Sequence, residues 1–198
     1  MKLGQLEIRV IRNLSYVVIY LSGLTYLLLP SPVPLPLPGA TKSVEPGDTW
    51  QNPDQAAYFT QKDRTEVLTF YQQSFAPSLF GIKLPNYRLN YRPEDTSVYV
   101  RKYIDSYYLE EIINPMRESL FVNGWTPSKS PLLDQYTEEF RKTFTIVVDD
   151  QTYSSKITIK PYYGGRFAAA VIWTILLPTT YFALRLFFSS LKYLRSSL

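Results

Sequence analysis

The hydrophobic pattern of the chain is strongest near its C-terminal end. Residues 167–184 form a run of eighteen residues without a charge, and the apolar residues 186–188 extend this run past Arg185. As a helix, eighteen residues rise about 27 Å, close to the ~30 Å thickness of a bilayer core. The pattern predicts a joint at Gly164 and Gly165 followed by a transmembrane helix, which together make up residues 164–191.

A second uncharged run lies near the N-terminus. Residues 14–29 follow a basic segment, 1–13, and would rise about 24 Å as a helix. This layout is typical of a signal peptide or a signal anchor. Because the run leads into Pro30 and a proline-studded segment rather than an A-x-A-like cleavage site, we expect an uncleaved signal anchor that forms transmembrane helix 1.

The distribution of charge suggests an orientation. The net charge of +4 would suit nucleic acid, but residues 31–165 hold fourteen Lys or Arg and sixteen Asp or Glu. The positive excess flanks the two runs, so we expect no nucleic-acid partner. Six basic residues are expected to anchor the helix ends at the membrane: Arg9, Arg12, Arg166, Arg185, Lys192 and Arg195. The positive-inside rule then predicts a two-pass protein of the cell membrane, with the basic N-terminus 1–13 and the basic tail 192–198 cytoplasmic and residues 30–165 extracytoplasmic.

Residues 30–51 are predicted to connect the first run to a folded domain. Prolines alternate with other residues from Pro30 to Pro38, which favours a stiff polyproline II segment about 28 Å long. We expect a proline-rich spacer that holds the domain away from the bilayer, followed by an irregular linker. The apolar residues Val33, Leu35 and Leu37 could instead lie on lipid headgroups or dock on the domain.

Residues 52–163 are predicted to form an extracytoplasmic α+β domain, and two of its segments indicate helices. Asp63 and Glu66 have the spacing of a capping box, and apolar residues then recur at steps of three and four, which predicts a helix over 64–75. Pro93 followed by two acidic residues predicts a second helix over 93–104. Residues 56–60 fit either a strand or the end of a short helix.

Other segments of the domain indicate strands. Residues 87–91 look extended, and residues 107–113 and 117–125 suit a strand, turn, strand unit. Alternation on either side of a turn at 149–151 predicts another hairpin, from Phe144 to Ile159. The expected fold class is α+β: a small antiparallel sheet of at least four strands with about two helices on one face, flanked by one N-terminal and one C-terminal transmembrane helix.

The composition limits the chemistry that the chain can perform. It contains no His and no Cys, which excludes a Ser-His-Asp triad, a cysteine nucleophile and a His-ligated metal or haem. No phosphate loop or EF-hand spacing is present, so we expect no cofactor and no metal site. Glu110 and Glu111 are adjacent on a predicted strand and point to opposite faces, which does not suit a paired acid and base. We expect one of them to face solvent and the other to pair with Arg117 across the hairpin.

Aromatic residues are numerous, with seventeen Tyr, eleven Phe and three Trp. Those in the apolar runs, among them Tyr16, Tyr20, Trp173 and Tyr181, are expected at membrane interfaces. In the domain, six aromatic residues could form a face that stacks on glycans or binds protein, with ordinary core packing as the alternative: Tyr107, Tyr108, Trp125, Tyr153, Tyr162 and Tyr163.

Together these patterns favour a non-enzymatic protein of the cell envelope whose domain binds or scaffolds, as part of a complex. Its expected partners are the lipid bilayer and another envelope protein or a cell-wall polymer, with homo-oligomerisation as a further option. One alternative is a cell-wall or glycan-processing enzyme that uses carboxylates alone. Another is a small oligomeric channel, for which Pro178 and the joint at Gly164 and Gly165 are the only hints.

Overall fold

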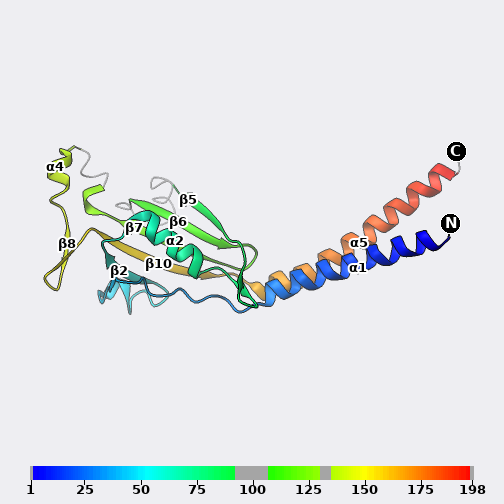
Figure 1. Ribbon diagram of the computed structural model, residues 1–198, viewed down its shortest axis with the longest axis horizontal. Coiled ribbons are helices and arrows are strands. Elements are labelled where there is room, and N and C mark those ends of the chain that lie inside the picture. The colour runs from blue at the N-terminus through cyan, green and yellow to red at the C-terminus, as the bar shows by residue number, and fades with distance from the viewer. Residues whose placement is uncertain (1, 92–106, 130–134, 197–198) are drawn as a thin grey trace. The chain divides into compact units, whose positions relative to one another are not determined.

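The computed structural model describes residues 2–91, 107–129 and 135–196 (Figure 1). The chain divides into a helix unit, residues 1–29 and 165–198, and a domain, residues 30–164. In the described part, the protein is α+β, with a six-stranded antiparallel sheet and four helices. The predicted fold class is confirmed at this level.

The helix unit contains α1 (Lys2–Leu28) and α5 (Arg166–Ser196). Both helices include a stretch long and apolar enough to cross a membrane, Glu7–Leu28 in α1 and Arg166–Leu191 in α5. Only 6% of the most apolar 18 residues in each stretch is buried. α1 also includes most of the predicted basic N-terminus, residues 1–13. α5 continues through Pro178. The two predicted apolar runs are therefore helical, and their apolar side chains face outward.

Aromatic side chains join α1 to α5 within this unit. The Tyr16 hydroxyl donates a hydrogen bond to the carbonyl of Leu177, and the rings of Tyr16 and Tyr181 lie 4.4 Å apart between centroids. Trp173 lies against Gly23 so closely that a Cβ at Gly23 would overlap the indole ring. These aromatic residues, which we expected at membrane interfaces, form the contact between the two helices. A hydroxyl or an indole N–H on an apolar helix can find its partner on the neighbouring helix, as Tyr16 and Trp173 do.

The domain is built on one sheet with strand order β1-β2-β10-β7-β6-β5, in which every pair of neighbours is antiparallel. Its strands are β1 (Thr41–Lys42), β2 (Ala56–Thr60), β5 (Tyr87–Tyr91), β6 (Tyr108–Asn114), β7 (Glu118–Trp125) and β10 (Ser155–Tyr163). The predicted strand, turn, strand unit is confirmed as β6 and β7, and residues 56–60 form a strand.

One helix, α2 (Arg64–Ser74), packs on the sheet and begins at the predicted capping box. The Asp63 carboxylate accepts a hydrogen bond from the Glu66 N–H at 2.8 Å, and the Glu66 carboxylate accepts one from the Asp63 N–H at 3.0 Å. The predicted helix over 64–75 is thereby confirmed. The helix predicted over 93–104 lies outside the described residues.

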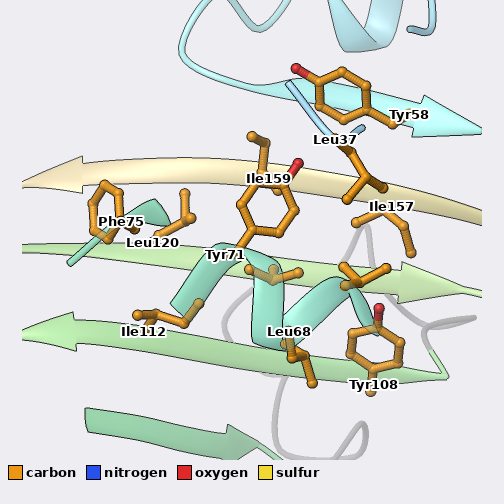
Figure 2. Packing of buried hydrophobic residues seen from close by; sticks show 12 residues of the cluster. Leu37, Tyr58, Leu68, Tyr71, Phe75, Tyr108, Ile112, Leu120, Ile157 and Ile159 are labelled. Atoms are coloured by element: carbon orange, nitrogen blue, oxygen red, sulfur yellow. The ribbon is translucent and has the colours of Figure 1, made fainter. Parts of the chain in front are cut away.

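The core of the domain lies between α2 and one face of the sheet (Figure 2). Tyr71 and Phe75 are fully buried and belong to one cluster with side chains from four neighbouring strands. Alternate residues of each strand supply these contacts, as the period of a half-buried strand requires. The strand residues of the cluster are Tyr58, Tyr108, Ile112, Leu120, Val122, Ile157 and Ile159.

The proline-rich segment belongs to the domain and is not a free spacer. Leu37 is 2% exposed and forms part of the core cluster, and Ser43 is buried nearby in the sequence. This matches the alternative in which Leu37 docks on the domain, rather than the expected spacer that holds the domain away from the bilayer. Burying Leu37 stabilises the docked segment, and its prolines cost little conformational entropy because they are already restricted.

Two small hairpins complete the domain. β3 (Ser78–Leu79) pairs with β4 (Ile82–Lys83), and β8 (Ile146–Val148) pairs with β9 (Gln151–Tyr153). The predicted hairpin over 144–159 is thus correct only for its first part. After β9 the chain passes Ser154 and enters β10 of the main sheet, where Ile157 pairs with residues of β2 and β7. The remaining described elements are η1 (Pro46–Asp48), η3 (Pro127–Lys129) and α4 (Glu138–Arg141).

Candidate functional site

The six aromatic residues of the predicted binding face lie in different environments. Tyr108 is in the core, and Tyr153, the last residue of β9, is 7% exposed. Tyr162 and Tyr163 are exposed but adjacent on β10, so they point to opposite faces of the sheet. Tyr107 packs against the core and Trp125 is half-buried at the end of β7. The structure therefore does not bring the six rings together on one surface.

A different aromatic cluster is exposed at the edge of the domain. We call residues 136–153 the aromatic arm, which contains α4 and the hairpin of β8 and β9 (Figure 1). The ring of Phe140 lies 5.0 Å from that of Tyr136 and 5.3 Å from that of Phe144. These three side chains are 38–47% exposed, and no residue of α4 is buried. The rings thus pack on one another rather than in the core.

Tyr153, at the C-terminal end of the arm, attaches the arm to the main sheet. The Tyr153 hydroxyl lies 2.6 Å from the hydroxyl of Thr41, and its ring lies 5.8 Å from that of Phe59. At the tip of the hairpin, Asp149 and Asp150 both have positive φ, which is typical of a tight two-residue turn. The arm is therefore a defined structure with one fixed end and an exposed aromatic cluster.

A second feature is a buried polar cluster at the turn between β6 and β7, which we call the clamp: Asn114, Arg117 and Glu118. Arg117 and Glu118 have side chains 0% and 1% exposed and form an ion pair of 3.1 Å. The Asn114 amide donates to the Glu118 carboxylate at 3.0 Å and to the carbonyl of Phe75 at 3.0 Å. The clamp therefore ties the end of α2 to the β6–β7 turn.

The clamp also holds both ends of the domain. The Arg117 guanidinium donates to the carbonyl of Pro30 at 3.1 Å, and the Ser31 hydroxyl donates to the Glu118 carboxylate at 2.7 Å. At the other end of the domain, Gly164 lies so close to the carbonyl oxygen of Arg117 that a Cβ would overlap it. The first and last residues of the domain thus meet at one buried ion pair.

The carboxylates considered for catalysis are held in ion pairs or hydrogen bonds. Glu110 is 1% exposed and is bound by Arg64 at 2.7 Å and by Arg88 at 3.0 Å. Glu111 is half-buried on the opposite face and accepts a hydrogen bond from Tyr91. The expected pairing of one of them with Arg117 is wrong, because the β6–β7 register places Glu110 opposite Val122 and leaves Arg117 in the turn.

A further charged cluster surrounds Lys156 on β10. Its ammonium lies 2.5 Å from the Glu45 carboxylate and 2.7 Å from that of Asp48, which also accepts from the Ser43 hydroxyl. Burial lowers the pKa of Lys156, but the hydrogen bonds and charges of Asp48 and Glu45 outweigh it and raise the pKa overall. Lys156 thus stays protonated and fixes η1 to the sheet. In the described ranges, no group of three acidic side chains is placed to hold a metal ion.

The hydrogen bond between Tyr91 and Glu111 predicts a measurable dependence of stability on pH. The Glu111 carboxylate, together with burial, raises the pKa of Tyr91 from about 10 to about 12. Because the unfolded tyrosine ionises first, this contribution to stability is complete below about pH 10 and is lost as the pH rises to about 12. We expect Tyr91→Phe to make the alkaline decline in the free energy of unfolding shallower, as measured by urea titrations at several pH values. An unchanged slope would contradict the assignment.

No protein-family model, curated protein or solved structure matches the chain.

Neither the aromatic arm nor the clamp is among the sites predicted from the sequence. The arm does leave a signal, because Tyr136, Phe140 and Phe144 recur at steps of four, and Thr137 N-caps the short helix between them. The hairpin predicted from the sequence starts at Phe144, which therefore counts there as a strand residue. The clamp leaves no comparable signal, since Pro30 and Gly164 are brought to Arg117 only by the tertiary fold.

Proposed function

We propose that this protein is a two-pass membrane protein whose extracytoplasmic domain binds another component of the cell envelope within a complex. One observation carries the proposal: a single folded domain lies in sequence between two long helices whose apolar side chains are exposed, and both ends of that domain meet at one buried clamp. Such helices have a favourable environment in lipid. The basic residues that flank them favour a cytoplasmic position for both termini.

In this proposal the aromatic arm is the binding surface. Exposed aromatic side chains are enriched at the centres of protein interfaces, where they supply large contact areas. The rings of Tyr136, Phe140 and Phe144 bury little surface in the domain itself. The arm also differs from the clusters around Lys156 and Glu110, in which each charge is already neutralised by its partners.

Site-specific photo-crosslinking in intact cells tests this role. A photoreactive amino acid replaces Phe140 in the full chain, and a matched control replaces Lys142, an exposed residue just beyond α4. We expect a discrete adduct from position 140 that is much weaker from position 142. An adduct with the mass of two chains would show that the partner is a second copy. Equal labelling at both positions, or no adduct at position 140, would contradict the proposed surface.

Removal of a ring provides a second readout. We expect Phe140→Ala to abolish most of the adduct formed by a photoreactive residue at Phe144, because hot-spot aromatics often contribute at least ~2 kcal/mol to binding. Since Phe140 is exposed, the unfolding transition of the domain should remain unchanged. A loss of the adduct together with a loss of domain stability would instead indicate a structural role.

A further inference from the structure

Among the residues that the structure describes, six exposed apolar or aromatic side chains at one end of the domain form a group that we call the rim. Phe80 and Ile82 come from the β3–β4 hairpin, Tyr87 from β5, Met116 from the β6–β7 turn, and Tyr162 and Tyr163 from β10. Their exposed fractions run from 53% at Tyr163 to 95% at Phe80. Scattered apolar residues on a surface need no explanation, but a group of this kind at one end of a domain does.

Strand register places the rim at the end of the sheet that holds the clamp. Tyr87 pairs with Ile113, Ile113 with Ser119, and Ser119 with Tyr162, so one row of residues crosses four strands. Asn114, at the end of β6, binds the carbonyl of Phe75 at the end of α2. The β3–β4 hairpin follows Phe75 after two residues, with Leu84 donating back to the carbonyl of Pro77. All six rim residues thus belong to the same end of the domain.

The chain connects this end to the two apolar helices with very few residues. Pro30, whose carbonyl is bound by the clamp, lies two residues after the end of α1. Tyr163 lies three residues before the start of α5. At ~3.3–3.6 Å per residue, three residues reach at most about 11 Å. The interfacial layer on each side of a bilayer core is itself several ångströms thick. The rim is therefore within reach of the headgroup region if α1 and α5 span the membrane.

The chemistry of the rim suits that layer. Tyrosine combines an apolar ring with a hydroxyl that can remain hydrated, and aromatic residues are enriched at membrane interfaces. Phe80 and Met116 both have positive φ, which puts them at the tips of tight turns. Resting on the proposed two-pass topology, we propose that the rim inserts into the headgroup region of the bilayer, so that the domain lies on the membrane surface. The contact is with lipid rather than with a protein.

Fluorescent labelling of single cysteines tests this contact, since the natural chain has no Cys. The full chain, with Phe80→Cys or Tyr162→Cys, is labelled with a polarity-sensitive dye and reconstituted into phosphatidylcholine vesicles with or without nitroxide-labelled lipid. Val44→Cys and Val147→Cys serve as exposed controls away from the rim, because Val44 adjoins the cluster around Lys156 and Val147 belongs to the arm. Val18→Cys, on α1, reports on the apolar helix itself.

We expect a blue-shifted emission and a loss of most of the intensity with nitroxide lipid at positions 80 and 162, and neither effect at positions 44 and 147. If the labels at 80 and 162 behave like those at 44 and 147 while the label at Val18 is quenched, the rim contact is wrong and the topology stands. A blue shift at the rim without quenching by lipid would indicate a protein neighbour and would also overturn the proposal. If the Val18 label is not quenched, the proposed membrane insertion itself fails.

Discussion

Replacing Arg117 with alanine is expected to lower the free energy of unfolding of the domain by about 3–5 kcal/mol. The Arg117 side chain is fully buried, and its removal leaves the Glu118 carboxylate, which is 1% exposed, without its cation. The substitution also removes the hydrogen bond to Pro30. Urea titration of the full chain in a mild detergent, followed by intrinsic fluorescence, measures the change. A loss of this size is a large share of the ~5–15 kcal/mol that stabilises a typical domain.

Two control variants separate the buried ion pair from a general loss of charge. Lys142→Ala removes a similar cation from an exposed pair with Glu138, whose side chains are 70% and 74% exposed, and should leave the titration unchanged. The double variant Arg117→Met with Glu118→Leu removes both buried charges and should recover much of the loss. If Arg117→Ala shifts the titration no more than Lys142→Ala does, the buried ion pair does not stabilise the domain.

The other large effect is expected at Tyr71, in the centre of the core. Tyr71 is 0% exposed and belongs to the cluster between α2 and the sheet, as Figure 2 shows. Tyr71→Ala leaves a cavity of about ring size and should cost about 3–5 kcal/mol of unfolding free energy. The same urea titration in detergent provides the measurement.

The matched variant Tyr71→Phe tests what the hydroxyl contributes. In the part of the chain that the structure describes, the Tyr71 hydroxyl has no hydrogen-bond partner, and burial raises its pKa above the usual range. Removing a buried group that makes no hydrogen bond should change the free energy of unfolding by less than about 1 kcal/mol, or increase it. If Tyr71→Phe proves as destabilising as Tyr71→Ala, then the hydroxyl is bound and the described packing is incomplete.

Local signals in the sequence were sufficient for the elements that they specify. The capping box at Asp63 and Glu66 marks the start of α2, because both of its hydrogen bonds lie within four residues of chain. The two helices of the helix unit follow from the two long uncharged runs near the ends of the chain. The strands β6 and β7 follow from aromatic and branched residues on either side of a turn.

Features that depend on tertiary contacts were not predictable in this way. Alternation from Tyr153 to Ile159 indicates extended chain, but it does not show that pairing changes at Ser154 from β8 to the strands of the main sheet. Likewise, the alternating proline segment offers Val33, Leu35 and Leu37 for docking, and only the tertiary fold selects Leu37 for the core. The aromatic residues of the predicted face failed to gather because Tyr162 and Tyr163 are neighbours on a strand and must diverge.

The most direct test of the account is the accessibility of single cysteines in intact cells. Val44 is 86% exposed, and Val44→Cys is compared with Ser197→Cys in the basic tail. With a membrane-impermeant maleimide and the chain recovered from the membrane fraction, we predict that position 44 reacts in intact cells and that position 197 reacts only after lysis. Reaction at 197 with silence at 44 would reverse the topology, and recovery of the chain in the aqueous fraction without detergent would contradict membrane insertion altogether.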